Sequence, residues 1–167
     1  MLSNHRLIFY PHDQERCLDA AIINAKKVCA QKNTKLSTMR ESVLVLIWQG
    51  HKPKGAYDIL DGVAKTTGKS IAPPTIYRAL DFLLDMGLIH RIASLNAYIG
   101  CPFPSHEHSN LFMICEHCGS TAEIADTGLN NTLSSICVSA DFTLKTQYIE
   151  LKGLCPKCQS ESANSEQ

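Results

Sequence analysis

Residues 73–100 read PPTIYRALDFLLDMGLIHRIASLNAYIG. Two prolines open a helix whose apolar residues recur at three- and four-residue steps, and Gly87 follows its last turn. After Gly87 the apolar period changes to two, over 88–92 and again over 97–100, with a short turn between the two runs. A β-hairpin directly behind such a helix is typical of the winged helix-turn-helix, which this stretch therefore predicts.

Three further helices are predicted upstream, over residues 13–32, 38–48 and 56–67. The first carries one apolar stripe that includes Cys17 and Cys29, so both thiols are assigned to a core rather than to a metal. Thr38 and Glu41 have the spacing of a capping box at the start of the second helix. The third helix is expected to end at Gly68.

Charge separates the two halves of the chain. Residues 1–90 hold 12 Lys and Arg against 8 Asp and Glu, whereas residues 91–167 hold 4 against 8. The chain as a whole is neutral, so the difference indicates a basic module suited to a polyanion and an acidic, cysteine-bearing module.

Arg78 lies at the start of the helix that the two prolines open, where its guanidinium could enter a major groove and bind guanine O6 and N7. The candidate phosphate contacts are Tyr57, Tyr77, Lys69 and Arg40. The alternative is a solvated helix face with partly buried tyrosines. The hairpin behind the helix favours DNA binding.

Two Cys-x-x-Cys pairs, Cys115 with Cys118 and Cys155 with Cys158, are separated by 36 residues. Each pair can turn both sulfurs toward one tetrahedral ion, and four thiolates are the ligand set of a closed structural zinc site. Two disulfides or four unrelated thiols are the alternatives, but the repeated spacing favours zinc. The ion would join elements that are distant in sequence.

The C-terminal half predicts a small α/β unit, with strands at 111–114, 121–125 and 142–151 and a helix over about 127–138. Cys137 falls among apolar neighbours on that helix and is assigned to packing. The predicted fold class is α+β. Its expected parts are a winged-helix domain at 1–100, a connector at 101–109, a metal-binding domain at 110–158 and a disordered tail at 159–167.

A second group of metal-binding side chains lies between the hairpin and the second C-terminal strand: His90, Cys101, His106, His108 and Glu123. Nitrogen, sulfur and carboxylate donors form a mixed set that suits tetrahedral zinc, and a thiolate disfavours magnesium. The alternative is a polar histidine loop beside a buried thiol, because these residues do not form a spaced motif.

Length and composition indicate one or two small globular domains, with 167 residues of which 44% are apolar. No apolar run approaches membrane-spanning length, and the first residues lack the features of a signal peptide. Eight cysteines without an export signal favour the cytoplasm, where thiolates bind metal rather than pair.

The chain resembles the Fur family of metalloregulators, and its zinc-sensing members in particular, over about residues 25–158. The resemblance rests on KLSTMR (35–40), AYDIL (56–60), PPTIYRALDFLLDMGLIHR (73–91), NAYIGC (96–101) and HSNLFMICEHCG (108–119). It implies a cytoplasmic homodimer with an N-terminal winged helix and a C-terminal dimerisation domain. Such a dimer would bind palindromic double-stranded DNA operators and repress transcription when metal-loaded.

Two zinc sites per subunit follow from the resemblance. The four paired cysteines would hold the structural ion, and His90, Cys101, His108 and Glu123 would hold the regulatory one. Tyr57 and Arg78 would lie nearest the bases.

Two features depart from the family pattern. Thr38 and Met39 stand where a proline is common before Arg40. The His-His-Asp-His string of iron sensors is shortened to His106-Glu107-His108, which weakens an iron assignment and leaves His106 as a rival of His108.

The leading hypothesis is a zinc-responsive repressor of zinc uptake genes, in which one ion shared by the wing and the dimerisation domain sets the orientation of the DNA-binding head. The rival within the family is an iron or peroxide sensor, against which Cys101 argues because its thiolate would oxidise. A zinc enzyme such as a nucleobase deaminase needs a His-x-Glu, a Pro-Cys-x-x-Cys and an open coordination position, a pattern that this chain lacks. A zinc-stapled interaction module is disfavoured by the basic half, and neither a small-molecule substrate nor a membrane is an expected partner.

Overall fold

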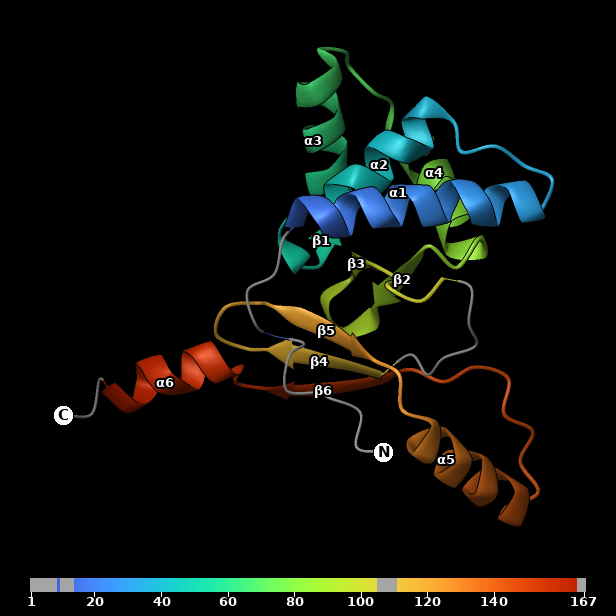
Figure 1. The fold of residues 1–167 in the computed structure, drawn as a ribbon, viewed down its shortest axis with the longest axis vertical. Coiled ribbons are helices and arrows are strands. Elements are labelled where there is room, and N and C mark those ends of the chain that lie inside the picture. The colour runs from blue at the N-terminus through green and yellow to red at the C-terminus, as the bar shows by residue number, and fades with distance from the viewer. Residues whose placement is uncertain (1–8, 10–13, 105–110, 165–167) are drawn as a thin grey trace. The chain divides into compact units, whose positions relative to one another are not determined.

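The computed structural model describes residue 9 and residues 14–104 and 111–164. The chain divides into two compact units, one over 11–105 and one over 106–167 that also takes in residues 1–10 (Figure 1). The division falls inside the connector expected at 101–109. Within the described part of the chain, no helix has both the length and the apolar character needed to cross a membrane.

The 11–105 unit is built from helices with a small antiparallel sheet, ordered β1-β3-β2. The helices are α1 (Gln14–Gln31), α2 (Thr38–Trp48), α3 (Ala56–Thr67) and α4 (Pro73–Asp85). The strands are β1 (Lys54–Gly55), β2 (Ile89–Ile92) and β3 (Ala97–Gly100), with 3-10 turns at Gln49–His51 and Ala93–Leu95. The predicted helices and the hairpin of the wing are thus confirmed, whereas the two-residue β1 was too short for its pattern to reveal.

Apolar residues at helical spacing form one core in this unit. The residues that α2, α3 and α4 contribute with at most 1% of their surface exposed are Val43, Leu44, Ile47, Ile59, Val63, Ile76, Leu80 and Leu83. Cys29 of α1 lies in the same core, as its place on the apolar stripe predicts, and burial raises the pKa of its thiol. The core fixes the helix that presents Arg78.

Both ends of α4 follow from its sequence. Pro73 and Pro74 occupy its first two positions, where a missing N–H costs no hydrogen bond. At the other end Gly87 adopts a left-handed φ of 68°, while the N–H of Leu88 donates to Leu83 O at 2.9 Å. This is a Schellman ending, which turns the chain directly into β2.

The start of α2 differs from the prediction of a capping box. Ser37 is the N-cap, without a side-chain cap hydrogen bond, and Thr38 is the first helical residue. Glu41 instead forms an ion pair with Lys26 of α1, with Nζ and Oε1 3.2 Å apart. The partner supplied by α1 changes the role of this glutamate, and spacing within α2 could not show it.

The 106–167 unit centres on a sheet ordered β5-β4-β6, in which β4 (Leu111–Cys115) pairs antiparallel with β5 (Thr121–Ile124) and parallel with β6 (Ile149–Gly153). Because β5 and β6 run in opposite directions, the helices that follow them, α5 (Thr127–Ser139) and α6 (Pro156–Asn164), leave opposite ends of the sheet (Figure 1). Asp126 caps α5 by accepting the N–H of Leu129 at 2.8 Å.

Two expectations for this unit were wrong. The strand predicted over 142–151 begins only at Ile149, because its pairing partner β4 is five residues long and residue 149 already pairs with Leu111. The stretch from 159 was expected to be disordered from its polar composition, but α6 continues to Asn164. Its first turn contains Cys158, so the cysteine cluster described below anchors the start of that helix.

Candidate metal centre and nucleic-acid interface

The four paired cysteines come together in the 106–167 unit. Their Sγ atoms lie within 4.8 Å of one another, and those of Cys118 and Cys155 are 3.8 Å apart. A disulfide would require about 2.05 Å. In a tetrahedron with Zn–S distances of about 2.3 Å, two sulfurs lie about 3.8 Å apart. The geometry therefore fits one ion held by four thiolates and not two disulfides.

Local backbone structure presents each pair. Cys115 is the last residue of β4, and the N–H of Gly119 donates a hydrogen bond to the Cys115 carbonyl at 2.9 Å. Gly119 has a left-handed φ of 72°, and this tight turn forms the first knuckle. In the second, Cys155 precedes the proline that opens α6, and Gln159 N–H donates to its carbonyl at 2.9 Å. Cys155 N–H also donates to Cys115 Sγ at 3.3 Å, which joins the two knuckles.

The acidities of the thiols agree with a cation among them. Burial raises the pKa of Cys115, but backbone N–H groups of Cys118, Cys155 and His117 outweigh it and bring that pKa to about 6. Burial and the neighbouring sulfurs together raise the pKa of Cys158 to about 12. The Cys158 thiolate is thus unfavourable by itself, and a divalent ion would supply the charge that stabilises it.

Phe9 packs against this cysteine cluster. Phe9 groups with the C-terminal unit rather than with the helices that follow it in sequence. Sequence spacing gave no indication of this contact, because the short apolar run at residues 7–10 has no period that would indicate what Phe9 packs against.

Two of the residues expected in the second metal site lie side by side at the base of the wing. His90 is on β2, opposite Ile99, and Cys101 directly follows β3. An imidazole nitrogen of His90 and Sγ of Cys101 lie within 4.8 Å of each other. Cys101 is 3% exposed, so this pair of donors sits largely out of solvent.

The other expected ligands belong to the 106–167 unit. Glu123 lies on β5 and is buried, with 8% of its surface exposed. His108 and its rival His106 lie outside the described residues.

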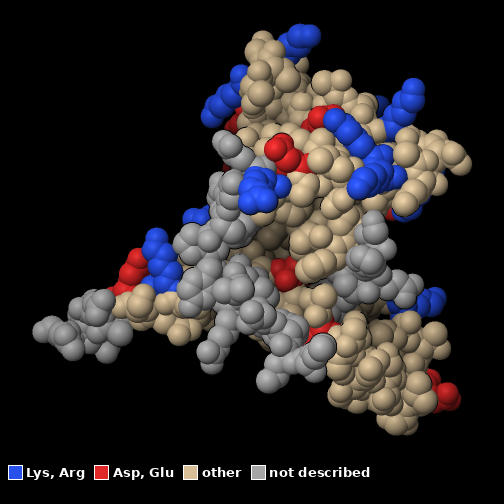
Figure 2. Space-filling model, in the orientation of Figure 1, with Lys and Arg blue, Asp and Glu red and all other residues tan. Residues whose placement is uncertain are grey.

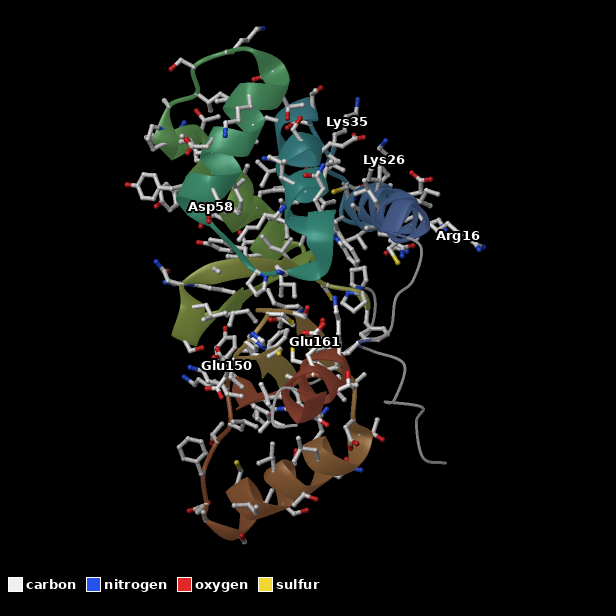
Figure 3. All side chains as sticks on the ribbon, turned by 90° about the vertical axis from the view of Figure 1, so that its left-hand side faces the viewer. Arg16, Lys26, Lys35, Asp58, Glu150 and Glu161 are labelled. Atoms are coloured by element: carbon white, nitrogen blue, oxygen red, sulfur yellow. The ribbon has the colours of Figure 1, made fainter. Side chains whose placement is uncertain are left out.

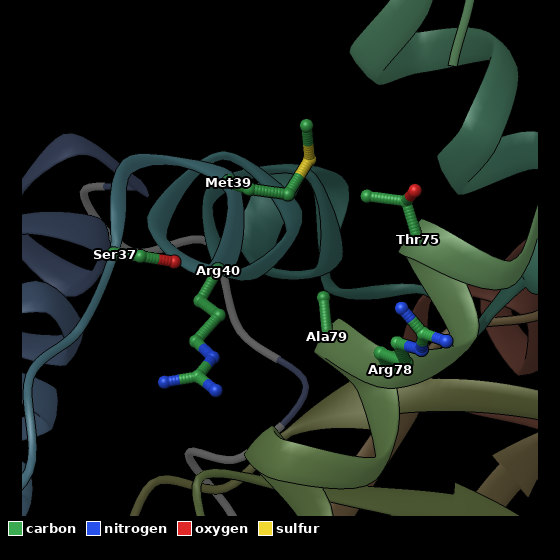
Figure 4. Close-up of a pocket in the computed structure, with 6 residues that line it drawn as sticks. All are labelled: Ser37, Met39, Arg40, Thr75, Arg78 and Ala79. Carbon is green, nitrogen blue, oxygen red and sulfur yellow. The ribbon is translucent and has the colours of Figure 1, made fainter. Parts of the chain in front are cut away.

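Arg40 and Arg78 line one pocket of about 200 Å³, where the first turns of α2 and α4 meet (Figure 4). Ser37, Met39, Thr75 and Ala79 complete its wall. The Arg40 guanidinium stacks over the Phe82 ring at 3.4 Å from the centroid, and its Nη1 donates to Lys35 O at 3.2 Å. Two cationic side chains and two hydroxyls at helix N-termini are a suitable lining for an anion such as a phosphate.

The remaining candidate DNA contacts are also at the surface. Tyr57, in the first turn of α3, is 70% exposed, and Tyr77 on α4 is 42% exposed. Lys69 is exposed just beyond the C-cap of α3, so most of the length of that 12-residue helix separates it from Tyr57. Lys and Arg side chains gather over the helices of the 11–105 unit on the face shown in Figure 2. Sequence reasoning missed Ser37 and Thr75 as members of the pocket, since only the packing of α2 against α4 reveals it.

Comparison with known proteins agrees with these observations. The sequence profile described as "Ferric uptake regulator family" matches residues 31–152. The zinc uptake regulation protein of Escherichia coli (strain K12) is 36% identical over 138 residues, which cover 82% of this chain and 80% of that protein.

Solved structures with the same fold include a zinc uptake regulator complexed with zinc and DNA. It has a TM-score of 0.79 and 32% identity, and the match covers 92% of this chain and 99% of that one. The crystal structure of holo XcZur has a TM-score of 0.77 and 35% identity, over 86% of this chain and 99% of that one. The chain belongs to the ferric uptake regulator family.

Proposed function

We propose that this protein is a zinc-responsive transcriptional repressor, similar to the zinc uptake regulators (Zur), that binds palindromic operators as a homodimer and controls genes of zinc uptake. The observation that carries the proposal is the pair of donors His90 and Cys101 at the base of the wing of a winged helix. Metal binding there acts on the hairpin that stands directly behind the DNA-reading helix.

Two zinc ions per subunit are part of the proposal. The structural ion would be held by Cys115, Cys118, Cys155 and Cys158, and it would cross-link the end of β4 to the start of α6. His90, Cys101, His108 and Glu123 would hold the regulatory ion. Their donor set of nitrogen, sulfur and carboxylate suits zinc, and the burial of Cys101 and Glu123 keeps water from competing for it.

The regulatory ligands come from both units, and this explains how they could control DNA binding. When all four residues bind one ion, the wing and the C-terminal unit are restrained together, and the population shifts toward the arrangement that binds the operator. A shift from mostly open to mostly closed requires about 5.5 kcal/mol of differential binding, which several metal–ligand bonds can supply.

Operator contacts are assigned to the face that carries the pocket. Arg78 would read a guanine edge from the first turns of α4, and Arg40, Lys69, Tyr57 and Tyr77 would contact phosphates or the bases beside them. Support comes from the exposure of the tyrosines and from the shared pocket of Arg40 and Arg78.

Homodimerisation is supported by the apolar surface of the 106–167 unit. None of the 13 residues of α5 is buried, and an isolated helix of that length is only marginally stable in water. The large apolar side chains exposed on this unit are Ile136, Val138, Phe142, Leu144, Tyr148, Leu151 and Leu154. A second copy of the chain would cover this surface and stabilise α5.

The proposed activity is binding and not catalysis, since four thiolates fill a tetrahedral ion and leave no position for a substrate. A reducing cytoplasm is the compartment in which eight unpaired thiols persist. Iron or peroxide sensing is the second candidate within the family, and the thiolate of Cys101 disfavours it.

Purified protein titrated with zinc and, separately, with iron(II) tests the proposal. We expect retarded migration of DNA from the promoter of a zinc uptake gene only when zinc is present, with two zinc ions per subunit by elemental analysis. Equal DNA binding in the presence of a strong chelator would contradict zinc control. Tighter operator binding with iron(II) than with zinc would favour the second candidate.

A further inference from the structure

Two more metal-binding side chains lie beside Cys158 without belonging to the four-cysteine set. His117, Cys158 and Glu161 each offer a ligand atom, and these three atoms lie within 4.8 Å of one another. His117 sits in the first knuckle, between Cys115 and Cys118, and Glu161 lies on α6, three residues after Cys158 (Figure 3). The group is therefore formed by the same two segments that present the four thiols.

Exposure distinguishes this group from the cysteine cluster. His117 and Glu161 are exposed, whereas Cys115, Cys155 and Cys158 retain 2%, 6% and 2% of their accessible surface. Glu161 has Lys157 Nζ 3.9 Å from its carboxylate, but both side chains are more than half exposed, so solvent screens this ion pair. The exposed group and the buried four-cysteine cluster therefore have one residue in common, Cys158, and the exposed group adds an imidazole and a carboxylate at the surface.

We propose that His117 and Glu161, together with Cys158, form a loading site through which zinc enters and leaves the four-cysteine centre. The inference rests on the proposed assignment of zinc to that centre. A hydrated zinc ion must exchange its water ligands one at a time before thiolates can surround it, and zinc accepts nitrogen, oxygen and sulfur donors alike.

Cys158 belongs to both ligand sets, which allows transfer without release of the ion. His117, Glu161 and Cys158 would bind the incoming ion first, and the Cys158 thiol would lose its proton to solvent as it becomes a thiolate ligand. Cys115, Cys118 and Cys155 would then release their remaining thiol protons to solvent, and their thiolates would displace the imidazole and the carboxylate while Cys158 stays bound. Departure follows the same steps in reverse, so the loading site affects the rates of loading and release but not the affinity of the final centre.

Transfer of zinc to excess EDTA from the fully loaded protein tests this inference. The measurement is made in the Cys101→Ser background, so that a single class of zinc is followed, and protein-bound zinc is counted by native mass spectrometry. We expect the double variant His117→Ala/Glu161→Gln to slow transfer about tenfold, which corresponds to raising the barrier to exchange by about 1.4 kcal/mol. Equilibrium affinity, measured by chelator competition, should not change.

Glu116→Gln is the matched control. Glu116 is an exposed carboxylate in the same knuckle, next to Cys115, but it is not part of the loading site. Removing its charge should leave the transfer rate as it was.

Unchanged transfer in the double variant would overturn the inference. Faster transfer would also overturn it, because it would mean that these two side chains only shield the centre from the chelator. A fall in the equilibrium affinity for zinc would likewise overturn the inference, since it would mean that His117 and Glu161 stabilise the final four-cysteine centre. Wild-type protein that contains no zinc on its four cysteines would refute the centre itself, a result distinguishable from a loaded protein with unchanged rates.

Discussion

Cys101 is held by the backbone on both sides of its side chain. Its N–H donates to Leu88 O at 3.0 Å, and its Sγ accepts the N–H of Phe103 at 3.4 Å. A serine hydroxyl could make the same hydrogen bonds but does not ionise near neutral pH. The residue therefore offers a substitution that changes metal binding while the local structure is retained.

We expect Cys101→Ser to remain a folded dimer that keeps the zinc of its four paired cysteines, yet to lose zinc-dependent operator binding. Zinc per subunit should fall by about one equivalent, because one tetrahedral site loses its thiolate. Elemental analysis and a gel shift with and without zinc measure the two effects. If the variant bound its operator at the zinc concentration that suffices for wild type, the sensing site would lie elsewhere, and His106 would be the next residue to test.

Arg78→Ala should cost about 1–3 kcal/mol of operator binding per half-site and should relax base preference at one position, because a bidentate contact to guanine is lost. Affinities for a set of single-base operator variants, measured at one salt concentration, give both quantities. Lys69→Ala is the comparison, since loss of a phosphate contact weakens all sequences alike. Uniform weakening by Arg78→Ala would reassign Arg78 to the phosphates.

At the level of elements, α2 packs directly on the last residue of β3. A Cβ on Gly100 would come within 2.3 Å of Cε2 of Trp48, so the indole ring covers the glycine. Gly100 adjoins Cys101, and α2 also carries Arg40 in its first turn. The close approach therefore fixes the helix against the strand that leads to the proposed metal ligand Cys101.

Gly100→Ala should lower the free energy of unfolding by about 1–3 kcal/mol, the usual cost of overpacking a well-packed core. Urea unfolding followed by the fluorescence of Trp48, the single tryptophan, measures it. The control is Gly153→Ala, because the added Cβ would meet nothing within 4 Å there. Equal stability of both variants would contradict the close approach of the indole.

Cys118→Ser should unfold or monomerise the C-terminal unit, because the binding energy of a closed four-thiolate site is part of the folding energy. Circular dichroism and analytical ultracentrifugation of the variant follow the two effects. Cys17→Ser is a suitable control, since Cys17 lies on α1, outside both the metal cluster and the C-terminal unit. A Cys118→Ser protein that stayed dimeric and retained this zinc would refute the structural assignment.

At the scale of the whole molecule, the proposed function requires two copies of the chain, and substitutions on the apolar surface of α5 test how the two copies meet. Ile136→Asp places a charge on a side chain that is 57% exposed in the single chain and buried in the proposed dimer. We expect monomers in sedimentation experiments and loss of operator binding. Ser134→Asp, on the opposite side of the same helix, should remain dimeric, and a dimeric Ile136→Asp would place the interface elsewhere.

The helices, the wing and the four-cysteine cluster were predicted from the sequence because each depends on consecutive residues or on a repeated local spacing. Pro73, Pro74 and Gly87 set the ends of α4 whatever surrounds it. The same local reasoning gave too long a strand before Ile149, since the length of a strand depends on its partner.

By itself, the sequence determined that a winged helix precedes a cysteine-stapled α/β unit, because periodicity, helix-ending residues and the Cys-x-x-Cys spacing act locally. Only the tertiary structure decided which distant side chains meet. It brought Arg40 to the same pocket as Arg78, Trp48 onto Gly100 and His117 beside Glu161. Such contacts depend on how whole elements pack, and a pattern read along the chain carries no record of the distance between two residues that lie far apart in it.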